Sequence, residues 1–227
     1  MNIEEAIKNC EIYSKQIKQY DPDPFYVNHF FTKYIELVNE IVNLIFEEAN
    51  RDFGLFISEK STQDKFLDKA KSKKDQNAIK FSEWYSITFD QEHKNPFPNA
   101  MKKICEFKKK LKKIPEIKIM IRASDRYKDD VNQEIKVNLT NKKLRSKEEL
   151  NIEIKRQLPI FLEIINHKRK KSNEPKVDEN QITTSTFMDI EDHKDIEIAY
   201  VSEIYISVLK RMIIEVRKEI KKLTTWE

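Results

Sequence analysis

The stretch "PFYVNHFFTKYIELVNEIVNLIFEEANRDFG", residues 24–54, decides the fold. From Val27 to Phe46 its apolar residues recur at three- and four-residue steps and cover well over half of a helix circumference. Asp23 is a suitable N-cap, Pro24 suits the first helical position, and Gly54 suits a C-terminal cap. The pattern therefore predicts a long central helix that neighbours cover on several sides.

The segments around this helix also have helical apolar spacing. Residues 3–19 predict a first helix and residues 62–92 a third, of which the second half is expected to dock. After the break at 95–99, residues 100–111 predict a fourth helix. Beyond Pro115 the positions Ile117, Met120, Ile121 and Ser124 predict a short fifth helix. Together these segments predict an antiparallel bundle.

The pattern changes at Asp130. Residues 132–140 alternate apolar and polar side chains and predict a strand, which the β-branched residues 182–190 are expected to pair with. Between them we expect a helix over 148–171 with Pro159 inside it, and a loop over 168–181. A last helix over 193–223 is expected to return to the bundle.

The fold class is thus mainly α, an antiparallel helical bundle with a small β-strand pair inserted before a long C-terminal helix. We divide the chain into a bundle core (1–129), a strand, helix and loop insert (130–192) and a C-terminal helix that packs back on the bundle (193–227). All three parts are expected to form a single domain.

Composition excludes several classes of function. The chain has 227 residues, of which 36% are charged and one is glycine, so glycine-rich nucleotide-binding loops are excluded. The two cysteines are expected to be reduced thiols at apolar positions, and the four histidines lack metal-ligand spacing. We expect no metal and no cofactor. The apolar stretches fall short of the roughly 20 residues that span a bilayer, so we expect a soluble cytoplasmic protein with no membrane partner.

A basic cluster runs through "EFKKKLKK", 106–113, into "IPEIKIMIRASDRYKDD", 114–130, where Arg122 is expected on the inner face of the short fifth helix. Lysines on the surface of a helical bundle often do no more than keep that surface hydrated. Their density here nevertheless predicts a surface that follows a phosphate backbone, with Tyr85 and Tyr127 available to stack on bases. The predicted nucleic-acid-binding residues are Lys109, Lys110, Lys113, Lys118, Arg122 and Arg126.

The order of the segments over residues 3–128 resembles HEPN-like proteins, a helical superfamily that includes metal-independent ribonucleases and toxins. The resemblance lies in the aromatic-rich helix "FYVNHFFTKYIELVNEIVNLIFEEAN", the "FSEWY" segment (81–85) and a helix that ends in an Arg. The rest of the chain resembles the tail of a poorly characterised archaeal and bacterial branch of that group. The resemblance implies a homodimer with RNA or a protein as its partner.

The catalytic motif of that superfamily is an Arg followed, after four to six residues, by a His that acts as acid and base. Arg122 matches the Arg, but Tyr127, Lys128 and Asp129 fill the window for the His. Because tyrosine has a pKa near 10, it is a poor base at neutral pH. We therefore expect a non-catalytic RNA-binding or partner-binding protein. The alternatives are a metal-independent endoribonuclease that uses Arg122 with Tyr127, and an interaction module of a toxin or defence system.

Overall fold

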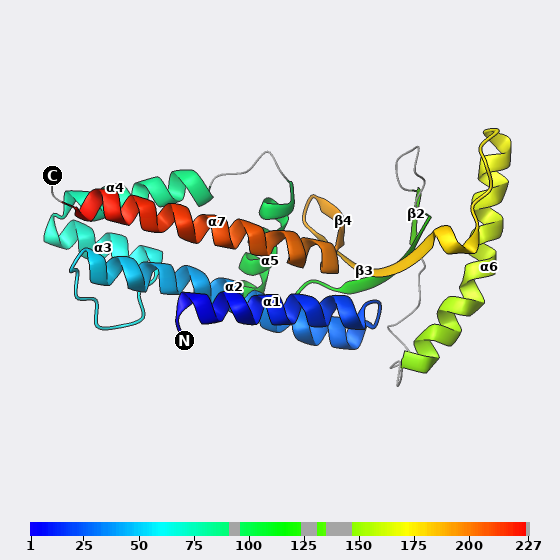
Figure 1. Cartoon of the computed structure of the whole chain (residues 1–227), viewed down its shortest axis with the longest axis horizontal. Helices are drawn as coiled ribbons and strands as arrows, with labels where there is room; N and C mark the ends of the chain where they lie inside the picture. The colour runs from blue at the N-terminus through cyan, green and yellow to red at the C-terminus, as the bar shows by residue number, and fades with distance from the viewer. Residues whose placement is uncertain (91–95, 124–130, 135–146, 226–227) are drawn as a thin grey trace.

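The computed structural model describes residues 1–90, 96–123, 131–134 and 147–225 (Figure 1). In these ranges the chain is mainly helical, with one antiparallel sheet. The helices are α1 (Ile3–Tyr20), α2 (Pro24–Asp52), α3 (Gln63–Lys73), α4 (Gln76–Tyr85), the π-helical η1 (Ser86–Asp90), α5 (Pro96–Leu111), α6 (Lys147–Lys171), the 3₁₀ turn η2 (Glu179–Gln181) and α7 (Ile198–Thr224). The strands are β1 (Ile117–Ala123), β2 (Val131–Glu134), β3 (Ile182–Ile190) and β4 (His193–Glu197).

Helix α2 is the central element that its sequence predicts. The Asp23 carboxylate accepts hydrogen bonds from the backbone N–H groups of Phe25 and Tyr26, which caps the N-terminus. At the other end, Gly54 takes a positive φ of 60° and its N–H donates to the carbonyl of Arg51. Figure 1 shows α1, α3 and α7 running along α2.

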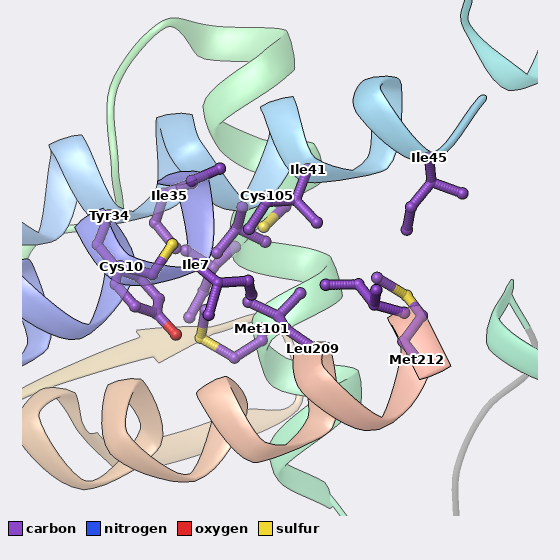
Figure 2. Packing of buried hydrophobic residues seen from close by; sticks show 14 of the residues in the cluster. Ile7, Cys10, Tyr34, Ile35, Ile41, Ile45, Met101, Cys105, Leu209 and Met212 are labelled. Carbon is purple, nitrogen blue, oxygen red and sulfur yellow. The ribbon is translucent and has the colours of Figure 1, made fainter. Parts of the chain in front are cut away.

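The main core forms where α1, α2, α5 and α7 converge (Figure 2). Tyr34 of α2 is fully buried there, and its hydroxyl donates to the carbonyl of Ser202 in α7 at 2.9 Å. Cys10 and Cys105 are buried, free thiols in the same core, and burial raises the pKa of each to about 12. Both are therefore uncharged packing residues at neutral pH.

Helices α1 and α7 are joined along their exposed edge by three ion pairs. They are Lys18–Glu203, Glu11–Lys210 and Glu4–Arg217. From one pair to the next, the residue number falls by seven on α1 and rises by seven on α7. This is the register of two antiparallel helices whose contact surface repeats every heptad. The C-terminal helix therefore returns to the bundle, as its sequence predicts. Its predicted start at residue 193 is wrong, because His193–Glu197 form β4 and the helix begins at Ile198.

The predicted third helix, 62–92, is wrong as one element. The chain forms two helices, because Lys74 takes a left-handed conformation with a φ of 56° and ends α3. Asp75 then accepts a hydrogen bond from the N–H of Ala78 and starts α4. The docked second half is as expected: α4 buries Phe81 and Tyr85.

The short fifth helix predicted after Pro115 is also wrong, because residues 117–123 form the strand β1. Ile119, Met120 and Ile121 are all buried, as is typical of a strand covered on both faces. The predicted strand at 132–140 begins as β2, and its residues 135–140 lie outside the described part. Residues 182–190 form β3 as predicted, but they pair with β1 instead of the earlier predicted strand, in the sheet order β2-β1-β3-β4.

The sheet contributes to two separate apolar clusters. At one end, Met188 and Ile190 of β3 and Ile196 of β4 join the core of the bundle. At the other end, Ile121 of β1 joins a small cluster with Phe161 of α6 and further residues. Figure 1 shows α6 standing across the far end of the molecule, away from the bundle. Helix α6 continues through Pro159 and ends at Lys171, both as predicted. Residues 168–171, which the predicted loop also included, are therefore helical. The remaining members of the small cluster are Ile165 and Val177.

One carboxylate joins the α1–α2 turn to the sheet. Asp21 accepts hydrogen bonds from the backbone N–H of Thr186 at 2.8 Å and from its hydroxyl at 2.6 Å. Burial raises the pKa of Asp21 to about 6, although the hydrogen bonds from Thr186 oppose this shift. The Asp21 carboxyl group, which links the turn to the sheet, therefore changes its protonation state just below neutral pH.

We expect Phe46→Ala to lower the free energy of unfolding by about 3–5 kcal/mol. Phe46 is fully buried and packs against Phe66, Phe81 and Tyr85 at ring-centroid distances of 4.9–6.0 Å, so truncation leaves a cavity. Urea denaturation measures the change. Phe25→Ala is the control, because Phe25 is 73% exposed and its loss is expected to cost about 0.5 kcal/mol or less. Equal effects of the two substitutions would contradict the central position of α2.

Exchanging the charges of one α1–α7 ion pair tests the heptad register. We expect Glu11→Lys and Lys210→Glu each to lower the free energy of unfolding by about 0.5–1 kcal/mol, because each single change places like charges opposite one another. The double exchange is expected to recover most of that loss. If the two losses simply add in a double-mutant cycle in urea, the helices do not meet in this register.

Asp21→Asn is expected to change the pH dependence of stability. A raised pKa means that, between about pH 4 and pH 6, the folded chain binds more protons than the unfolded chain, so this carboxyl makes stability fall as pH rises. The free energy of unfolding of the Asn variant, compared with that of the wild type, should therefore rise by on the order of 2–3 kcal/mol between pH 4 and pH 7. Urea midpoints across this range measure it, and parallel curves for the two proteins would rule out the titration of Asp21.

Candidate nucleic-acid interface

The basic cluster borders a hollow between the end of α5 and the start of α2. Helix α5 ends at Leu111, and Lys112, with a φ of 58°, turns the chain toward β1. The hollow has a volume of about 560 Å³. We call it the basic hollow; its lining includes Phe25, Asn28 and Thr32 of α2, Lys108 of α5, and Lys112, Lys113 and Glu116 of the connection to β1.

The lysines of the basic cluster differ in whether their ammonium groups have a partner within the protein. Lys108 is largely covered, lies 3.3 Å from a carboxylate oxygen of Glu36, and donates to the carbonyl of Lys112. The other lysines of the cluster are exposed, and no hydrogen bond or ion pair engages their ammonium groups among the described residues. These exposed cations are Lys109, Lys110, Lys112 and Lys113.

Lys118, a predicted nucleic-acid-binding residue, is held differently. Its ammonium lies 2.9 Å from both carboxylate oxygens of Asp189 and 2.7 Å from Asp195, which belong to β3 and β4. Burial alone would lower the pKa of Lys118, but its hydrogen bonds to Asp195 and Asp189 outweigh this and raise it. Lys118 therefore joins strands of the sheet, and its charge is compensated within the protein.

Aromatic rings lie beside the basic hollow. Phe25 is 73% exposed and Tyr26 is 42% exposed, which is unusual for large rings at the start of a packed helix. The two rings meet edge to face with centroids 5.5 Å apart, and Tyr26 stacks on Tyr20 at 4.6 Å. The N-terminus of α2 is already capped by Asp23, so the lysines supply the positive charge of this surface.

The remaining predicted site residues are not brought together in the described part. Arg122 lies on β1, with its backbone opposite Thr183 of β3 and Asn132 of β2, and not on the inner face of a helix. Arg126 and Tyr127 lie outside the described residues. Tyr85 is buried, and its hydroxyl contacts the sulfur of Met212 at 3.8 Å, so the expectation that it stacks on bases is wrong.

Sequence reasoning missed the contribution of α2 to this surface. Phe25, Asn28 and Thr32 line the basic hollow although they lie far from the lysines in the sequence. A signal was present for Phe25: it precedes the buried Val27 by two residues, which places it on the opposite face of the helix. Which loop this face meets depends on the tertiary fold and has no local signal.

The described residues include neither a metal-binding group nor a membrane-spanning helix. No group of three or more His, Cys, Asp or Glu side chains is arranged there to hold a metal ion. His29 and His167 are exposed, and His193 lies 3.8 Å from a carboxylate oxygen of Asp192. None of the helices in the described ranges combines the length and the apolar character needed to span a membrane.

No family model, curated protein or solved structure matches this chain. The candidate interface therefore rests on its own geometry and charge.

Proposed function

We propose that this protein binds single-stranded RNA at the basic hollow and does not cleave it. The observation that carries the proposal is a run of exposed lysines next to an exposed aromatic ring. Lys112 and Lys113 line the basic hollow together with Phe25, and Lys109 and Lys110 precede them in the last turn of α5. Their ammonium groups have no acidic partner among the described residues and are therefore available to replace the counterions of a phosphate backbone.

The exposed rings favour a single strand over a duplex. Unpaired bases stack on aromatic side chains, whereas the bases of a duplex already stack on one another. Phe25 is mostly exposed at the wall of the basic hollow, and Tyr26 lies beside it. A strand that follows the lysines would therefore place its bases within reach of Phe25.

The absence of the motif His supports binding without cleavage. A metal-independent ribonuclease needs a group that exchanges protons near neutral pH, and losing a catalytic His commonly reduces the rate by about a hundred- to ten-thousandfold. Arg122 has no His in the expected sequence window. The HEPN-like assignment and the homodimer remain hypotheses, and a molar-mass measurement in solution tests the homodimer.

The test is fluorescence anisotropy with a labelled single-stranded RNA at several salt concentrations. We expect Lys109→Ala/Lys110→Ala/Lys113→Ala to weaken binding at least tenfold and to lower the slope of log affinity against log salt by about 2, since each lost phosphate contact on a single strand removes about 0.7. Phe25→Ala is expected to cost about 1–3 kcal/mol of binding free energy with an unchanged salt slope.

The matched control neutralises three exposed lysines elsewhere, Lys71→Ala/Lys80→Ala/Lys221→Ala, which changes the net charge equally. If the control weakens binding as much as the cluster variant, the attraction is a property of total charge and the basic hollow is not the site. Cleavage of the RNA without added metal, abolished by Arg122→Ala, would instead support the ribonuclease.

A further inference from the structure

One residue of the basic hollow does not suit a surface that only attracts phosphate. Glu116 lines the hollow in the connection to β1, shortly after Lys113. Its side chain is exposed, and no hydrogen bond or ion pair engages its carboxylate among the described residues. A carboxylate repels the phosphate backbone that the neighbouring lysines attract. Its place in the hollow therefore points to a partner other than phosphate.

The opposite wall of the basic hollow presents a side-chain amide. Phe25, Asn28 and Thr32 follow one another at steps of three and four residues, so they share one face of α2. Asn28 is exposed, and its Oδ1 accepts a long hydrogen bond of 3.5 Å from the hydroxyl of Thr32. This leaves the two N–H donors of its Nδ2 without a partner in the described part of the chain. The hollow therefore holds an amide donor, a carboxylate acceptor and an aromatic ring.

These three groups match the functional groups of one nucleobase. Guanine carries two neighbouring donors on its Watson–Crick edge, the N1–H and the N2 amino group, and the O6 acceptor lies beside them. A carboxylate has two acceptor oxygens and can take both donors at once, while an amide N–H can donate to O6. The face of the base can stack on an aromatic side chain. Guanine therefore offers a partner to each of the three groups.

The other bases suit this pair of polar groups less well. Adenine and cytosine each place a ring-nitrogen acceptor beside a single amino group, so a carboxylate that accepts from the amino group also meets a lone pair. Uracil has one N–H between two carbonyl oxygens, and both oxygens repel a carboxylate. Bidentate contacts to a base edge commonly distinguish one base from another by about tenfold or more.

We propose that the basic hollow selects guanine, with Glu116 accepting from N1–H and the N2 amino group, Asn28 donating to O6, and Phe25 stacking on the base. The volume of about 560 Å³ is within the range of small-molecule sites. Lys112 and Lys113 line the same hollow and can bind the phosphates that flank the guanosine. This inference rests on the proposed RNA binding and adds the base that the site prefers.

Fluorescence anisotropy with labelled oligouridines of equal length tests this preference, because the strands differ only in one central nucleotide. We expect the strand with guanosine to bind about tenfold more tightly than strands with adenosine, cytidine or uridine at that position. Inosine is the matched probe, since it keeps N1–H and O6 and lacks only the N2 amino group. We expect the inosine strand to bind several-fold more weakly than the guanosine strand, because one hydrogen bond to Glu116 is lost.

Glu116→Gln separates base recognition from charge attraction, because its two expected effects have opposite signs. Loss of the negative charge is expected to strengthen binding of the all-uridine strand, while the preference for guanosine falls below about threefold. Asn28→Ala is expected to lower the preference several-fold, since it removes the donor to O6. Both side chains are exposed, so neither substitution is expected to lower the urea midpoint.

Glu106→Gln is the matched control. Glu106 is exposed in the same segment as the lysines but does not line the basic hollow, so its substitution changes the net charge equally and is expected to leave the guanosine preference intact. Equal affinities of the guanosine and uridine strands, or the same preference in the wild type and in Glu116→Gln, would overturn the inference. RNA binding itself would stand if affinity still depended on Lys109, Lys110 and Lys113, and loss of that dependence would overturn both.

Discussion

Burial of α2 along nearly its whole length is the constraint on which the rest of the structure depends. Its inward residues, from Val27 to Ala49, are covered by α1, α5 and α7, and toward its C-terminus by α3 and α4. An apolar surface this wide cannot face water, so the other helices must surround it. Because its middle is enclosed, α2 is left accessible mainly at its two ends, and the basic hollow lies at the N-terminal one.

The helices were predictable from the sequence because their signals are local. The cap at Asp23, the left-handed Gly54 and the apolar period of α2 are all read within one segment. The break at Lys74 was missed because a lysine in a left-handed conformation has no reliable sequence signal. Asp75, a common N-cap residue, was the one indication that a new helix starts there.

Strand β1 was missed because a helical period was assigned to its apolar residues. Ile117, Ile119 and Ile121 alternate with Lys118, Met120 and Arg122, which is the two-residue period of a strand, but a helical spacing also fits Ile117, Met120 and Ile121. Short apolar segments often allow both readings. The pairing that decides between them, with β3 some sixty residues later, is tertiary and has no local signal. For the same reason the sequence identified the lysine cluster but not Phe25 as its neighbour, or the carboxylates that hold Lys118.

The charges at the two ends of α2 only partly follow its dipole: the Asp23 carboxylate at the N-terminus and Arg51 in the last turn are favourable, but other charges are not. The lysines of the basic hollow lie beside its N-terminal end, and Glu47, Glu48 and Asp52 lie in its last two turns, where acidic side chains are unfavourable by a few tenths of a kcal/mol each. Arg217 offsets Glu48, but Glu47 and Asp52 have no such partner among the described residues. Lys112 and Lys113, which have no acidic partner among the described residues, are the clearer departure from what stability favours, as is typical of a surface that binds a ligand.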